Sequence, residues 1–276
     1  MPISLSPGRS LDQAAICAAA AALDGAERSH VQIPLLSEDH PAMTMDDAYA
    51  IQAEWVGTKR ARGDKVVGWK IGLTSKAMQV ALSIDIPDSG VLLRSMVIKN
   101  DATIPPQRFI QPRVEAEIAF VTKTPLAGPG LSRDAIIEAT EYIAPALEIL
   151  DTRITRKDPR SGKLRAVFDT IADNAANAGV VLGKPLRFFR DIDLRWVGAV
   201  VSRNDEVEET GLGAGVLNDP LLSISWLADR LASYGDHIEA GQILLSGSFI
   251  RPVEAPSGSR IEADFGTFGS VRCLFD

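Results

Sequence analysis

Residues 114–120 read VEAEIAF, an alternation of apolar and acidic side chains. On a β-strand, successive side chains point to opposite faces of the sheet. The apolar residues of this run therefore share one face, while Glu115 and Glu117 lie side by side on the other. This period of two predicts a half-buried strand.

Strand-like segments dominate the chain after residue 65. They are rich in Val, Ile, Leu and Phe and are bounded by Gly, Pro, Asn or Asp. They outnumber the expected helices and do not alternate with them, which favours an α+β fold with a mixed or largely antiparallel sheet system over a doubly wound fold. The expected strands span 66–73, 91–98, 114–122, 145–151, 178–183, 193–203, 206–210, 243–247, 260–264 and 269–275.

Helical patterns are concentrated near the N-terminus. Residues 10–28 are rich in alanine, the strongest helix former. Thr44, followed three residues later by Asp47, is close to a capping box at the start of a second helix. Two further helices are expected, at 132–142 and at 218–235, the latter with a proline in its first turn.

A third acidic residue, Glu148, stands inside the apolar run PALEIL at 145–150. A lone acid in such a strand is costly unless it is paired or bound to a metal. Glu115 and Glu117 would repel each other unless a cation neutralises them, and hard cations such as Mg²⁺, Mn²⁺ or Ca²⁺ prefer oxygen ligands. The three carboxylates therefore predict a metal site. The alternative is a solvated strand face whose acids pair with Lys or Arg.

Lys70 interrupts the apolar strand at 66–73, between Gly68 and Gly72. A lysine held there either pairs with a carboxylate or has its pKa lowered by desolvation, so that it can move protons near neutrality. The alternative is a lysine whose ammonium group reaches solvent. The two glycines indicate a close approach by a ligand or by another strand. His40, in a loop between helices, is either a surface residue or a mobile acid/base on a closing segment.

The composition argues against two classes of partner. With a net charge of −7, the chain lacks the basic surface that neutralises phosphates, so we expect no nucleic acid and no anionic membrane as a partner. The apolar run 16–23 is too short to span a bilayer, and no basic cluster precedes it. Cys17 and Cys273 lie among apolar neighbours, which predicts buried, reduced thiols and a cytoplasmic protein.

Several longer motifs follow one another from about residue 38 onward. They are HP at 40–41, DAYAIQ at 47–52, KIGLTS at 70–75, EAE at 115–117, PALE at 145–148, FDTIADNAANAG at 168–179, DLRW at 193–196, GSF at 247–249 and RPV at 251–253. In these motifs the chain resembles the hydratase/decarboxylase branch of the fumarylacetoacetate hydrolase superfamily. Runs of this length in this order are more specific than any single motif.

The resemblance implies a fold and a set of site residues. The fold would be the mixed β-roll of the superfamily's C-terminal domain at 65–276, preceded by a helical N-terminal region at 1–64, in a homo-oligomer. The metal, Mg²⁺ or alternatively Mn²⁺, would be held by three ligands. Lys70 would be the active-site lysine and His40 would lie on the segment that closes over the site. The implied ligands are Glu115, Glu117 and Glu148.

The resemblance also implies an activity. The chain would be a metal-dependent hydratase, a lyase that adds water to a small 2-hydroxy-2,4-dienoate or 2-oxo-enoate acid in the catabolism of aromatic compounds. One alternative within the branch is a decarboxylase of a 2-oxo-enedioate. A second is a hydrolase that cleaves a C–C bond in an acylpyruvate, and a third is a catalytically inactive binding protein on the same fold.

A dicarboxylate substrate requires a cation at its far end. Arg251 is the expected partner, because a guanidinium group binds a carboxylate through two parallel hydrogen bonds. The segment 153–165 holds six basic residues and one acid. It is expected to be a solvated loop or, alternatively, to steer an anionic substrate. Ser248, Thr74 and Asp173 are the other expected substrate-binding residues.

Overall fold

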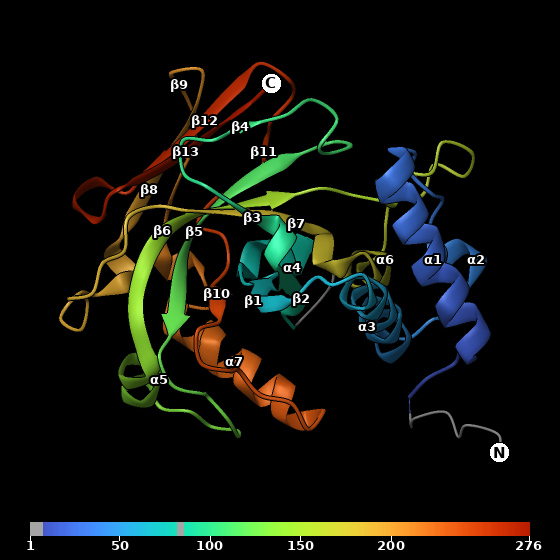
Figure 1. Cartoon of the computed structure of the whole chain (residues 1–276), viewed down its shortest axis with the longest axis horizontal. Helices are drawn as coiled ribbons and strands as arrows, with labels where there is room; N and C mark the ends of the chain where they lie inside the picture. Colours follow the sequence, from blue (N-terminus) through green and yellow to red (C-terminus); the bar gives the residue numbers. More distant parts are fainter. Residues whose placement is uncertain (1–7, 82–85) are drawn as a thin grey trace.

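The computed structural model describes residues 8–81 and 86–276 and is built on two curled β-sheets (Figure 1). The larger sheet is mixed: β1 pairs with β10 and β3 with β7 in parallel, and its other neighbouring strands are antiparallel. Its strands run in the order β2 (Asp88–Leu93), β1 (Val66–Gly72), β10 (Ile243–Leu245), β5 (Arg113–Thr122), β6 (Thr140–Leu150), β7 (Asn177–Leu182) and β3 (Val97–Ile98), and β11 (Val253–Glu254) pairs with β5.

The smaller sheet packs against the larger one through a shared apolar core. Its hairpin between β8 and β9 turns at Asn204 and Asp205, which both adopt positive φ. The expectation of an α+β fold with a mixed β-roll is confirmed. The strand order is β4 (Thr103–Ile104), β13 (Ser270–Phe275), β12 (Ser259–Asp264), β8 (Gly198–Arg203) and β9 (Glu206–Leu212).

The long antiparallel pair β5–β6 forms the centre of the larger sheet. Its register places Glu115 opposite Glu148 and Glu117 opposite Ala146. The apolar face of β5 enters the core, as the alternation predicted. The opposite face is also covered, so that Glu117 and Glu148 are fully buried and the strand is not the half-buried one expected from the sequence.

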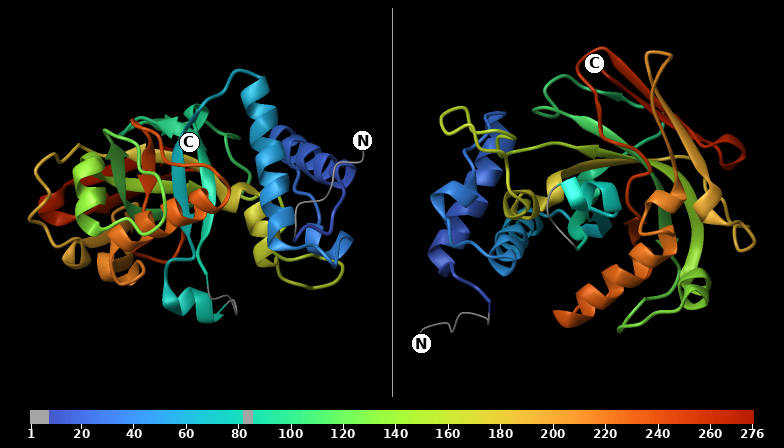
Figure 2. Two further views of the ribbon diagram at one scale, coloured as in Figure 1. Left: turned by 90° about the horizontal axis from the view of Figure 1, so that it is seen from below. Right: turned by 180° about the vertical axis from the view of Figure 1, so that it is seen from behind.

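The N-terminal helices pack beside the sheet (Figures 1 and 2). The expected capping box is present, because Thr44 accepts from Asp47 N and the Asp47 carboxylate accepts from Thr44 N. Their apolar faces share a core with Val91 of β2 and Ile171. Because this core crosses the expected boundary between 1–64 and 65–276, that division stays a prediction. The helices are α1 (Gln13–Ser29), α2 (Leu36–Asp39) and α3 (Met45–Ala61), covered in part by α6 (Val167–Ala172).

The remaining helices are α4 (Lys76–Ala81), α5 (Arg133–Ala139) and α7 (Pro220–Ser233). The helix expected at 132–142 ends at Ala139, because the β-branched and aromatic residues that follow continue directly as β6. The start of the strand expected at 193–203 is instead a 3₁₀ turn. The short helices α2, α4 and α6 were not expected, since four to six residues carry too little periodicity to be recognised.

The two cysteines differ in environment. Cys273 is buried on β13, and burial raises the pKa of its thiol to about 12. Cys17 is exposed, contrary to expectation, because Ile16 and Ala20 form the buried face of α1 and Cys17 lies on the other side. In the described part of the chain, no helix has both the length and the apolar character needed to cross a membrane.

Candidate metal centre and active site

Three carboxylates converge on the covered face of the larger sheet. Glu115 and Glu117 project from β5, and Glu148 projects from the facing position on β6. One oxygen atom of each lies within 4.8 Å of the others. The two-residue spacing on one strand and the cross-strand register together produce this cluster, which has the oxygen ligands that a hard divalent cation prefers.

The electrostatics of the cluster call for a cation. Burial, and then the carboxylate of Glu148, raise the pKa of Glu115 to about 8. Burial, followed by the carboxylates of Glu148 and Glu115, also raises the pKa of Glu117 well above its ordinary value. Within the described part of the chain, one buried oxygen each of Glu117 and Glu148 has no hydrogen-bond partner. Buried oxygens without partners are costly, and a bound cation would satisfy both.

Lys70 on β1 lies at the edge of this cluster, with its Nζ 3.5 Å from Oε1 of Glu148. The side chain is buried, so the surface alternative does not apply. Burial disfavours the charged form, but the carboxylates around it, Glu148 first, outweigh burial and raise the pKa of Lys70. Of the two possibilities left open by the sequence, the structure shows the pairing with a carboxylate.

Two residues of the site were not recognised in the sequence. Asp88, at the start of β2, is buried beside Lys70 with one oxygen unpartnered. Asn177, at the start of β7, donates a 2.6 Å hydrogen bond from Nδ2 to Oε1 of Glu148. Two features of the sequence could have indicated them. Gly72, a glycine expected to be closely approached, lies opposite Asp88 in the β1–β2 pair, and Asn177 belongs to the motif at 168–179.

Gly68 makes the expected close approach to another strand, whereas at Gly72 two side chains come close instead. A Cβ at Gly68 would collide with the backbone of Ile243 on β10. A Cβ at Gly72 would lie 2.9 Å from Nζ of Lys70 and would collide with the carboxylate of Asp88. The absence of a side chain at residue 72 therefore lets Lys70 and Asp88 occupy the same small space.

We expect Gly72→Ala to lose about 10-fold or more in kcat/KM and about 1–3 kcal/mol of stability, the usual cost of overpacking a closed site. Steady-state kinetics and denaturant unfolding check both. Gly57→Ala in α3 is the matched control, since a Cβ there meets nothing within 4 Å. It should keep full activity and gain about 0.5–1 kcal/mol. Unchanged kinetics in Gly72→Ala would contradict this account of residue 72.

A cavity of about 400 Å³ opens beside the carboxylates. Two groups of charged side chains line it. The first comprises the site residues Lys70, Asp88 and Glu115, and the second comprises Arg113, Arg156 and Arg165 with the acid Asp151. The cavity therefore has the size and polarity to hold a small anionic substrate against the carboxylate cluster.

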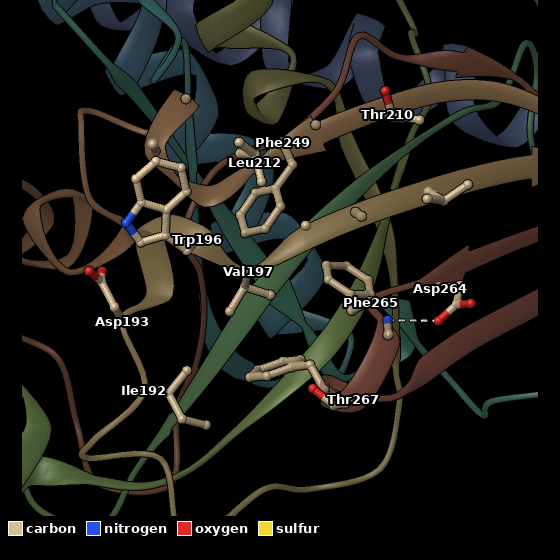
Figure 3. A pocket seen from close by; sticks show the side chains of 18 of the residues that line it. Ile192, Asp193, Trp196, Val197, Thr210, Leu212, Phe249, Asp264, Phe265 and Thr267 are labelled. Atoms are coloured by element: carbon tan, nitrogen blue, oxygen red, sulfur yellow. Dashed lines mark hydrogen bonds between the residues drawn. The ribbon is translucent and has the colours of Figure 1, made fainter.

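A larger hollow of about 1380 Å³ lies elsewhere, against the smaller sheet (Figure 3). Its walls are mainly apolar, with Trp196, Leu212 and Phe249 prominent, and none of the clustered carboxylates lines it. Of the acids that line it, Asp264 accepts a 2.8 Å hydrogen bond from the backbone N of Gly266, and Asp193 pairs with Arg195 at 2.6 Å. The smaller, charged cavity is therefore the candidate site of the reaction.

Thr74 and Ser248 lie around the turn after β10. The backbone N of Gly247 donates a 2.7 Å hydrogen bond to Glu117, and Thr74 packs against Gly247 so closely that a Cβ there would collide with it. Ser248 Oγ donates to the carbonyl of Ile250 and accepts from its N–H. Both expected residues support the segment that holds Glu117, and neither lines the cavity.

The structure does not bring three other expected residues into the cavity. His40 follows α2, half-buried, and is not among the cavity-lining residues. The buried carboxylate of Asp173 is held by Arg153 through its Nε and backbone N. Arg251 is 78% exposed and pairs with Glu209 at 2.6 Å, away from the cavity. The sequence could not show this, because contacts between distant segments decide where each side chain points.

The chain resembles several named proteins, although no protein-family model matches it. It is 50% identical over 254 residues to 2-oxo-hept-4-ene-1,7-dioate hydratase of Escherichia coli, covering 92% of this chain and 95% of that protein. The structure of 4-oxalocrotonate decarboxylase from Pseudomonas putida G7, complexed with magnesium and adipate, superposes with a TM-score of 0.90 at 34% identity, covering 97% of this chain and 100% of the other.

The fold extends to more distant structures. A putative fumarylacetoacetate hydrolase family protein from Yersinia pestis CO92 superposes with a TM-score of 0.54 at 15% identity, over 75% of this chain and 92% of that one. At 15% identity this likeness shows the fold alone, whereas the hydratase and decarboxylase relatives at 50% and 34% identity place the chain among lyases. The chain belongs to the hydratase/decarboxylase branch of the fumarylacetoacetate hydrolase superfamily.

Proposed function

We propose that the enzyme hydrates 2-oxo-hept-4-ene-1,7-dioate, which it receives as the 2-hydroxy-2,4-dienoate, to 4-hydroxy-2-oxoheptanedioate during the breakdown of aromatic compounds. The observation that carries the proposal is the convergence of three carboxylates and Lys70 on one small anion-binding cavity. The 50% identity to the Escherichia coli hydratase supports the choice of substrate.

The residues present fit a divalent cation, for which we propose Mg²⁺, with Mn²⁺ as the alternative. Glu115, Glu117 and Glu148 would hold it, and their unpartnered buried oxygens are the observation that supports this assignment. When bound there, the cation supplies positive charge that polarises the 2-oxo group and offsets the negative charge that develops on it during the reaction. Asn177 orients Glu148 through its hydrogen bond.

Lys70 and Asp88 are the proposed proton-handling pair. The ammonium of Lys70 attracts the C1 carboxylate of the substrate and orients it in the cavity. Burial raises the pKa of Asp88, partly offset by Lys70, and a carboxyl group whose pKa is raised is better suited to accept and return a proton. In the reaction a proton moves from the 2-hydroxyl of the dienol to C5, which gives the conjugated 2-oxo-3-enoate. Water then adds OH at C4 and a proton at C3. We propose that His40 takes part in proton transfer only when the segment that carries it moves toward the cavity.

A metal-dependent decarboxylase is the second candidate, because the decarboxylase structure shares the fold at 34% identity. It would release CO₂ from a 2-oxo-enedioate and leave the C4 position without a hydroxyl group. The motifs DNAANAG at 173–179 and RP at 251–252, together with the higher identity to the hydratase, favour hydration.

The test uses the purified protein with Mg²⁺ and 2-hydroxyhepta-2,4-diene-1,7-dioate. We expect the ultraviolet absorbance of the dienol to disappear without CO₂ release, and EDTA to abolish the change. CO₂ evolved from 2-oxo-hex-3-ene-1,6-dioate at a comparable rate would assign the enzyme to the decarboxylases. No reaction with either acid would refute the proposed function.

We further infer a homo-oligomer in the cytoplasm. The apolar hollow around Trp196, whose side chain is 72% exposed, is a large apolar surface of the kind that subunit contacts cover. Analytical ultracentrifugation tests the assembly, and a purely monomeric species at micromolar concentration would contradict it. The unpaired thiols Cys17 and Cys273 support a reducing compartment.

A further inference from the structure

The cavity carries more positive charge than the reaction itself explains. Arg113, Arg156 and Arg165 all line it, in addition to Lys70. Three guanidinium groups around one small space repel one another, and partial burial removes the water that would screen them. Such a group of neighbouring guanidinium groups is stable only where acids or a bound anion neutralise its positive charge.

Arg113 places the first guanidinium beside the metal centre. It stands two residues before Glu115 on β5, and therefore on the same face of the strand. Its Nε donates a 2.6 Å hydrogen bond to Oε1 of Glu254. Arg113 is thus paired and fixed in orientation.

Arg156 is the guanidinium without an acid. Among the residues that the structure describes, its nitrogens donate only to Gln111, at 3.1 Å to Oε1 and 2.9 Å to the backbone carbonyl. Within residues 8–81 and 86–276, no carboxylate forms an ion pair with it. The side chain is half-buried, and burial followed by the charge of Arg113 lowers its pKa.

Arg165 is also incompletely neutralised. It donates a 2.6 Å hydrogen bond to Thr152 Oγ1, and its nearest acid, Asp173 at 3.9 Å, is already held by Arg153. The remaining acid along the cavity, Asp151, accepts 2.8 Å hydrogen bonds from the backbone N of Ile110 and of Gln111. The wall therefore retains positive charge.

The dimensions suit a dicarboxylate. Two residues along a strand advance about 7 Å, which separates the backbone of Arg113 from that of Glu115. The carboxyl carbons of an extended seven-carbon diacid are joined by six C–C bonds of about 1.5 Å each, a span of roughly 7–8 Å. One carboxylate at the metal centre therefore leaves the other among the arginines.

We propose that Arg156, together with Arg113 and Arg165, binds the second carboxylate of the substrate and so makes the enzyme select dicarboxylates over monocarboxylates of the same length. The inference rests on the proposed function for the identity of the reacting end. Arg156 has the leading role because its guanidinium has no acid partner, so its donors are available to a carboxylate. Arg251, paired with Glu209 on the outer surface, has no part in it.

The test measures binding with saturated analogues that cannot be hydrated. Calorimetry with Mg²⁺ compares 2-oxoheptanedioate with 2-oxoheptanoate, which differ only in the distal carboxylate. We expect the wild type to bind the diacid about 10- to 100-fold more tightly, as hydrogen bonds to a charged group allow. Arg156→Gln should abolish the preference without weakening monoacid binding. Arg156→Lys should restore part of it, and Arg251→Gln, the matched control, should keep all of it.

Three results would overturn the inference: no diacid preference in the wild type, a preference kept in Arg156→Gln, or a preference lost in Arg251→Gln. Because binding of these analogues requires no turnover, the proposed function fails separately, through absence of dienol bleaching. Arg165→Gln provides a second variant, also expected to reduce the preference. Thermal unfolding of each variant confirms that it remains folded.

Discussion

Glu117→Gln is expected to lose most of its affinity for Mg²⁺ and at least about 10³-fold in kcat/KM, a loss of roughly 4 kcal/mol in transition-state stabilisation. Glu117 is fully buried, and one of its oxygens is free to bind a metal while the other accepts from Gly247. The amide keeps the shape and can still accept from Gly247, so the fold is retained. Metal titration and steady-state kinetics measure the effect, and normal Mg²⁺ binding with normal turnover would contradict the assignment.

The same variant should be more stable than the wild type when metal is absent. The pKa of Glu115 is about 8 in the folded chain, above its ordinary value of 4.5. The native state therefore holds a proton that the unfolded state releases, and the metal-free wild type loses stability as pH rises from about 4.5 to 8. Glu117→Gln removes one repelling charge, so its Tm at pH 8 should rise by about 2–5 °C.

The control for this pair of effects is Glu141→Gln. Glu141 lies on the same strand as Glu148 but is exposed and pairs with Arg187 at 2.7 Å. It should change neither metal affinity nor the pH dependence of Tm. Saturating Mg²⁺ should flatten the pH dependence of the wild type, since the cation replaces the protons. A Tm of the metal-free wild type that is constant between pH 5 and 8 would refute the electrostatic account of the cluster.

Lys70→Met is expected to lose about 10²–10⁴-fold in kcat/KM, the range for removal of a group that positions substrate and moves protons. Its metal affinity should be equal to or higher than that of the wild type, because the ammonium 3.5 Å from Glu148 no longer competes with the cation. Without metal, the variant leaves buried carboxylates with no counter-charge. It should therefore be destabilised by about 3–5 kcal/mol, and Mg²⁺ should restore much of that loss.

The matched control is Lys59→Met on α3. This lysine pairs with Asp24 at 3.2 Å and does not line the catalytic cavity. It should keep full kcat/KM. Kinetics, metal titration and unfolding with and without Mg²⁺ separate Lys70 from the metal ligands. A Lys70→Met variant that retains kcat but loses Mg²⁺ affinity would show that Lys70 supports the metal centre and not the reaction.

Local patterns predicted much of the fold. The alternation at 114–120 and the capping box at Thr44 each depend on neighbouring residues, and both are present. The β6 boundary was misplaced because a short helix and a strand meet at residues 139–140 without a turn signal. Cys17 was assigned to the core because its neighbours are apolar, although the helical period places it outside.

The sequence by itself determined that acids and a lysine interrupt apolar strands, since side-chain period and the cost of burying charge are local properties. It indicated Glu115, Glu117, Glu148 and Lys70 as a group. Only the tertiary structure decided that register brings Glu148 opposite Glu115, that Asp88 shares its space with Lys70, and that Arg156 faces the cavity while Arg251 faces solvent. The physical reason is that strand register and loop packing join residues far apart in the chain, and no local pattern records which of two arginines will lack an acid partner.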